Sequence, residues 1–150
     1  MTAITPSLPP TDALGLDDLH RKRRTAASTI NRAFLVLGTV AAFAVAGTLN
    51  GTAAHDLDPD LVRLMRFMAL LKGAFLLAAL AGSYWRLARP AAAWRTIVYV
   101  AAPALMAAGT VALWRLQDAG IAAVALHVGM FALLAAALTD RDFIPTLRRR

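Results

Sequence analysis

The chain has 150 residues, 59% of them hydrophobic and 17% charged, with a mean hydropathy of +0.57 and a formal net charge of +7. This composition excludes an ordinary soluble domain, because the apolar residues gather in four blocks of roughly 17–20 residues, each long enough to cross about 30 Å of hydrocarbon. The absence of cysteine excludes disulfides, thiolate metal sites and thiol catalysis. Basic residues stand at the ends of the apolar blocks, so the charge predicts orientation in a membrane and contact with its lipids, with no nucleic-acid partner.

Residues 1–32 are expected to form a cytoplasmic tail ahead of the first apolar block. Three prolines within the first ten residues favour a flexible segment or a partner-binding arm, in which Asp12 or Asp17 is suited to start a short helix. The tail ends in a polybasic run that is expected to contact anionic lipid headgroups and to set the orientation of the chain. This run consists of Arg21, Lys22, Arg23 and Arg24.

The membrane domain is expected at residues 33–139, as four helices joined by short loops. The second helix has the clearest start: Asp58 is suited to cap it, Pro59 fits its first turn and Asp60 complements its dipole. It is expected to run to about Leu87, with its first two turns in the membrane interface. Pro103 falls near the middle of the third helix and predicts a kink there. The embedded spans are expected at about residues 33–49, 67–85, 96–114 and 121–139.

The distribution of Lys and Arg predicts the topology. Twelve basic residues fall on the side of the N-terminal segment, the loop after the second helix and the C-terminal tail at residues 140–150, against three on the opposite side. This bias places both termini in the cytoplasm, and the short loops favour an all-α bundle of four antiparallel helices. Tyr84, Trp85, Trp94 and Trp114 lie at predicted span ends, where aromatic belts form. Small residues recur four apart in every span, a pattern expected mainly to pack the bundle internally.

Lys72 is the most unusual residue, because it is a charged side chain inside a predicted span. His127 lies near the middle of the fourth span, and Thr110 falls at a similar depth in the third. If the three faces converge, they form a ligand-binding pocket for a carbonyl or anionic group, such as a quinone head or a lipid phosphate. Lys72 and His127 also have plainer interpretations: Lys72 snorkels toward the interface or binds a backbone carbonyl, and His127 is a core histidine bonded to a carbonyl or Thr of a neighbouring helix.

Cofactor and metal sites are only weakly indicated. His127 is the one histidine in a predicted span, so a b-type haem, like a quinone, would need a partner subunit to complete its site. The loop between the first two helices offers His55 and Asp56 as weak candidates for a metal, but their spacing fits no known metal motif. No nucleotide-binding, zinc-hydrolase or serine-hydrolase motif is present, so no catalytic residue is assigned.

These features favour a small non-catalytic accessory or structural subunit of a larger inner-membrane protein complex, with membrane lipids and other membrane subunits as partners. One alternative is a membrane anchor that contributes to a quinone or haem site, and another is a small oligomeric transporter or channel. The abundance of Ala and Arg without Cys is typical of bacteria with GC-rich genomes. The basic C-terminal tail ends in Arg148, Arg149 and Arg150, which are expected to contact lipid headgroups.

Overall fold

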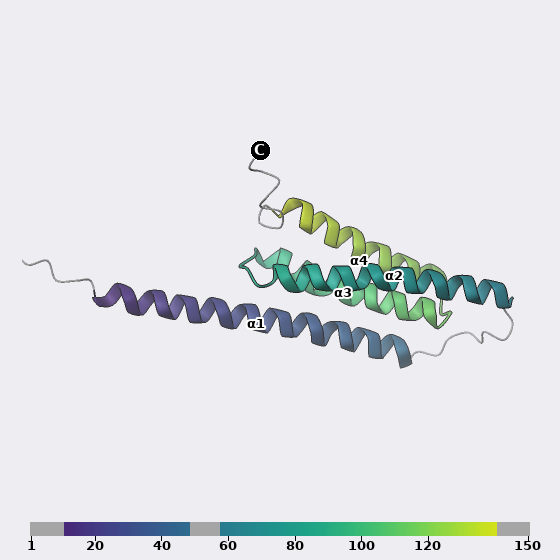
Figure 1. Ribbon diagram of the computed structural model, residues 1–150, viewed down its shortest axis with the longest axis horizontal. Helices are drawn as coiled ribbons and strands as arrows, with labels where there is room; N and C mark the ends of the chain where they lie inside the picture. Colours follow the sequence, from purple (N-terminus) through teal and green to yellow (C-terminus); the bar gives the residue numbers. More distant parts are fainter. Residues whose placement is uncertain (1–10, 49–57, 141–150) are drawn as a thin grey trace, which may run out of the picture.

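The computed structural model describes residues 11–48 and 58–140, and within them the chain is all-α (Figure 1). Each of the four helices is long and apolar enough to cross a membrane, as predicted for a multi-pass membrane protein. The helices are α1 (Thr11–Thr48), α2 (Pro59–Arg86), α3 (Ala93–Trp114) and α4 (Ala119–Thr139).

Helix α1 begins earlier than the sequence suggested. It runs without a break for 38 residues from Thr11, so most of the expected flexible tail is helical. Asp18 supports this early part, because its carboxylate pairs with Arg21 at 2.9 Å and with Lys22 at 3.3 Å, one turn further along. The N-terminal end of α1 extends well beyond the other three helices (Figure 1).

The start of α2 is formed as predicted. The Asp58 carboxylate accepts a hydrogen bond of 2.9 Å from the backbone N–H of Asp60, and Pro59 occupies the first turn. This cap satisfies one of the free N–H groups that every helix leaves at its beginning. Helix α2 ends at Arg86, one residue before the predicted end, and Leu87 is the C-cap.

Helix α3 is the centre of the bundle and packs against all three other helices. In its most apolar stretch 44% of the residues are buried, against 17% in α1, 17% in α2 and 22% in α4. Pro103 lies buried inside α3 without ending it. Helix α1 packs mainly on α3 and only slightly on α2.

The buried apolar residues form three clusters along the bundle. The first joins Leu35 of α1 to Leu87, Tyr99 and Ala136. The second joins α2 to α3 and contains Leu76, Ala79, Met106 and Ala107. The third lies at the other end and contains Ala69, Leu113 and Ala122. Each helix thus contributes residues to at least one cluster, and the first cluster lies at the end where α2 stops and α3 starts.

Two glycines set how closely α3 and α4 approach. A Cβ atom added to Gly109 would lie 2.6 Å from the carbonyl oxygen of Ala122, and one added to Gly129 would lie 2.8 Å from that of Ala102. Backbones that come this close rule out any side chain at the two positions. Small residues therefore serve packing within the bundle at this crossing.

The turn from α3 to α4 closes in a Schellman motif. Gln117 donates its backbone N–H to Ala112 O at 2.9 Å, and Leu116 donates its own to Leu113 O at 3.1 Å. Leu116 occupies the left-handed position with a φ of 58°, where glycine is usual. Its side chain is buried, so apolar contact offsets the conformational cost of that position.

We expect Gly109→Ala to lower the midpoint of thermal unfolding in detergent, since the added methyl group must push the α4 backbone away. Gly38→Ala is the matched control, because a Cβ atom at Gly38 meets nothing within 4 Å. It should leave the midpoint unchanged or raise it, since Ala favours helix over Gly by about 0.5–1 kcal/mol. Circular dichroism measures both midpoints, and equal midpoints for the two variants would contradict this packing.

Candidate functional site

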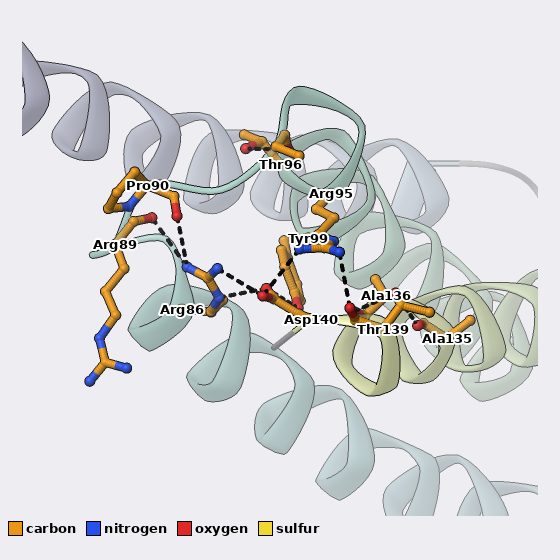
Figure 2. Close-up of polar contacts among 11 residues, drawn as sticks. Arg86, Arg89, Pro90, Arg95, Thr96, Tyr99, Ala135, Ala136, Thr139 and Asp140 are labelled. Carbon is orange, nitrogen blue, oxygen red and sulfur yellow. Dashed lines mark hydrogen bonds and ion pairs between the residues drawn. The ribbon is translucent and has the colours of Figure 1, made fainter. Parts of the chain in front are cut away.

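The most elaborate polar arrangement of the described residues is a buried ion-pair cluster at one end of the bundle (Figure 2). Arg86, the last residue of α2, is fully buried, and Asp140, which directly follows α4, is 4% exposed. The guanidinium binds the carboxylate in a bidentate manner, with Nε 2.6 Å from Oδ2 and Nη2 3.0 Å from Oδ1. This two-point geometry makes the ion pair directional as well as strong.

Two residues of α3 complete the cluster around the Asp140 carboxylate. Arg95 donates from Nη1 to Oδ1 at 3.3 Å and from Nη2 to the carbonyl of Thr139 at 2.9 Å. The Tyr99 hydroxyl donates to Oδ2 at 3.1 Å. Two arginines thus share one carboxylate, which leaves the cluster with a formal charge of +1.

Arg86 also fixes the turn between α2 and α3. Its Nη1 donates to the carbonyl oxygens of Arg89 and Pro90, each at 3.3 Å. All three nitrogens of this guanidinium therefore have acceptors, which a buried charge requires. The cluster connects the end of α2, the following turn, the first two turns of α3 and the end of α4, and its direct role is structural.

The contact among these residues is not predicted by the sequence pattern. In the sequence, Arg86 and Arg95 are loop charges that set the topology, and Asp140 is the first residue of the tail. One signal was present: Asp140 is the only acidic residue that directly follows a predicted span on the strongly basic side. A single carboxylate at that depth is a natural partner for the arginines at the neighbouring span ends.

Arginines stack on the aromatic residues that the sequence assigned to the membrane interfaces. The guanidinium carbon lies 4.5 Å from the ring centroid in both the Arg32–Tyr84 and Arg89–Trp85 pairs, and 5.2 Å away in Arg95–Trp94. These three pairs lie at the same end as the buried cluster. The fourth pair, Arg66 over Trp114 at 5.8 Å, lies at the other end. Such cation–π pairs suit the boundary between lipid and water.

Two of the three predicted ligand-binding residues, Thr110 and His127, bond to their own helices. Thr110 donates to Met106 O at 2.8 Å, and His127 Nδ1 lies 2.7 Å from Ala123 O. His127 is exposed on α4, whereas Lys72 is half-buried beside Gly73, whose added Cβ would lie 3.8 Å from the Thr110 side chain. Lys72 and Thr110 are therefore at a common level. Within residues 11–48 and 58–140 no hydrogen bond joins the three, and the shared pocket stays a prediction.

The other predicted binding residues are divided between described and undescribed parts of the chain. The polybasic run Arg21–Arg24 lies exposed on the extension of α1. His55 and Asp56, the weak metal candidates, and the terminal arginines Arg148–Arg150 lie outside the described residues. In the part of the chain that the structure does describe, no group of three or more His, Asp or Glu side chains is placed to hold a metal ion.

Comparison with known proteins returned no match to any family model, curated protein or solved structure.

We expect Asp140→Asn to destabilise the protein strongly, since it leaves two arginines without their carboxylate. Breaking a buried ion pair by removing one partner costs roughly 3–5 kcal/mol. Arg63→Gln is the control: it removes an exposed pair, Arg63–Asp60 at 3.4 Å, and surface pairs contribute at most about 1 kcal/mol.

The double variant Arg86→Gln/Asp140→Asn tests whether the two residues act together. Its loss of stability should be clearly smaller than the sum of the two single losses. Chemical denaturation in detergent micelles measures all four proteins, and additive losses would contradict a direct interaction between the side chains.

Proposed function

We propose that this chain is a non-catalytic subunit of a larger protein assembly in a bacterial inner membrane. The observation that carries the proposal is the exposure of His127 on the outer surface of α4. His127 is the ninth residue of this 21-residue helix, which places it about 12 Å from the helix start and near mid-membrane. A polar side chain at that depth is poorly solvated by hydrocarbon.

The hydrogen bond of His127 defines which group a partner subunit packed against α4 must provide. Ala123 O can only accept, so Nδ1 carries the hydrogen and Nε2 of the neutral ring is left as an acceptor. The described residues offer this nitrogen no donor. A neighbouring membrane subunit with a hydroxyl, amide or indole N–H at the same depth would satisfy it, and polar contacts of this kind join helices within membranes.

The extension of α1 supports the same proposal on the cytoplasmic side. From Thr11 to Arg24 the helix extends about 20 Å at 1.5 Å per residue, along a stretch that ends in the exposed polybasic run. A rigid charged helix of this kind is suited to bind a soluble partner or an anionic surface. Its exposed basic side chains suit binding better than catalysis.

The proposal includes an up-down-up-down arrangement with both termini in the cytoplasm. The twelve-to-three distribution of basic residues supports it, as does the composition of the core clusters. Leu87, Tyr99 and Ala136 share one cluster, so the end of α2, the start of α3 and the end of α4 lie at one level. Ala69, Leu113 and Ala122 share the cluster at the opposite end.

A redox anchor is the second candidate, and the same histidine favours it. With Nδ1 held by a backbone carbonyl, the ring is oriented as in many ligating histidines, and Nε2 is left to act as the ligand. A quinone or haem held between His127 and a partner subunit would use this nitrogen.

Mild-detergent affinity purification, with mass spectrometry and an absorption spectrum of the eluate, tests the subunit proposal. We expect stoichiometric membrane proteins to co-purify with the wild-type chain and to be depleted several-fold by His127→Leu. Leu138→Val, at another exposed position of α4, should not deplete them. A homogeneous eluate of this chain alone would overturn the proposal. Absorption bands of haem that His127→Leu removes would favour the redox anchor.

Single cysteines test the topology, since the natural chain has none. Ala88→Cys lies in the turn after α2, and Gly120→Cys lies at the start of α4, where an added side chain meets open space. In intact cells an impermeant maleimide should label Gly120→Cys and leave Ala88→Cys unlabelled until the membrane is permeabilised. The reverse pattern would invert the proposed orientation.

A further inference from the structure

An apolar groove lies between α2 and α4, where Met106 of α3 also lines it. Its volume is about 300 Å³, and nine of its ten described lining residues have apolar side chains or none. Helices α2 and α4 make little direct contact, whereas each packs on α3, so the groove lies open between them. Its lining includes the small residues Ala78 and Gly82 of α2 and Ala137 of α4. Small residues on such a surface let the backbone of another membrane helix approach closely.

The tenth lining residue, Ser83, is polar and lacks a hydrogen bond. Its side chain is 1% exposed, and its hydroxyl has no partner among the described residues. The hydroxyls of Thr39, Thr110 and Thr139, by contrast, each donate to the carbonyl one turn back on their own helix. A buried hydroxyl without a partner is costly. Ser83 is therefore a point in this groove at which a further polar group is needed.

His127 lies on the face of α4 that borders the same groove. It precedes Met130 by three residues and Leu134 by seven, and both of these line the groove. Residues at this spacing share one side of a helix. His127 is exposed, and with Nδ1 bonded to Ala123 O its Nε2 is left as an acceptor. Two polar groups that need a partner thus stand along one apolar groove.

The two groups lie at different depths. Ser83 lines the groove together with Ala137, and one turn further on Arg86 and Asp140 join the same two helix ends. His127 precedes Ala137 by ten residues of α4, which places it about 15 Å from the level of Ser83 along the helix axis. A molecule that satisfies both groups must carry polar atoms at two levels of the membrane.

This separation identifies the occupant as a helix. The acyl chains of a lipid carry no polar atoms and its headgroup stays at the interface, so one lipid does not reach both groups. A transmembrane helix bonds its own backbone and can present a polar side chain at any depth. In a second copy related by a twofold axis along the membrane normal, equal residues lie at equal depth, so Ser83 of one copy does not reach His127 of the other.

We propose that the α2–α4 groove is the docking site for one transmembrane helix of a partner subunit. This helix carries a hydrogen-bond donor for His127 Nε2 and, ten or eleven residues along the same face, a polar side chain for the Ser83 hydroxyl. Eleven residues make three helical turns, so both side chains can point into the groove. The inference rests on the proposed function, to which it adds the contact surface and the chemistry of the partner.

Photo-crosslinking of the full chain in its native membrane tests the occupant. With p-benzoylphenylalanine in place of Leu134, which lines the groove, we expect an adduct with a transmembrane segment of another protein. Sequencing of the adduct should show two polar residues ten or eleven apart in that segment. Val128 is the matched control position, because it is exposed on α4 outside the groove lining, and it should give several-fold less of this adduct. Adducts only with lipid or a second copy, or with a segment that lacks the two polar residues, would overturn the proposal.

Co-purification of the crosslinked partner with groove variants tests the site itself. Ala78→Phe fills the groove and should deplete the partner, whereas Ala135→Phe, at an exposed position of α4 outside the lining, should not. Ser83→Ala should lower the yield of the partner by about three- to tenfold, the effect of one hydrogen bond between membrane helices. It should not lower the midpoint of thermal unfolding of the isolated chain in detergent, because the hydroxyl bonds none of the described residues. A lower midpoint would assign Ser83 to the stability of the bundle and overturn its role in docking.

The outcome for the groove can be separated from that for the proposed function. If partner subunits co-purify equally with the wild type, Ala78→Phe and Ser83→Ala, the groove assignment is overturned and the subunit proposal stands. If no membrane protein co-purifies with the wild type, both are overturned.

Discussion

The burial of one guanidinium group, that of Arg86, organises the end of the bundle at which α2 stops. A charge removed from water needs a counter-charge and a full set of acceptors, and here Asp140 and two carbonyls of the following turn supply them. Satisfying this one group therefore fixes the end of α4, the path of the α2–α3 turn and the position of α3. Lipid does not drive apolar helices together, so such a contact has more influence on their arrangement than it would in a soluble core.

The same constraint accounts for the unequal contacts among the helices. Helices α2, α3 and α4 are tied by the ion-pair cluster and by the close backbone approach at Gly109 and Gly129. Helix α1 lacks both and instead rests on α3 through Leu35 and its neighbours, with Ser28 donating to Leu87 O at 2.8 Å.

The two proposals place the binding functions on surfaces that the bundle leaves uncovered. His127 faces outward from α4, the apolar groove lined by Ser83 lies between α2 and α4, and the N-terminal half of α1 extends past the bundle. The buried Arg86–Asp140 pair, by contrast, joins the end of α2 to the end of α4.

The local features of this protein follow from its amino-acid sequence alone. Apolar blocks of sufficient length produced the four helices, and Asp58, Pro59 and Asp60 set the start of α2, because these effects act within a few residues of the chain. Only the tertiary structure decided which charges are buried: Arg86 and Asp140 are 54 residues apart, and each looks like an ordinary interfacial charge until the helix ends meet. Whether Lys72, Thr110 and His127 meet is likewise a matter of tertiary structure. Their positions along the predicted spans place them only at a similar depth in the membrane. Depth along a helix follows from counting residues, whereas the direction that a side chain faces depends on how the helices pack.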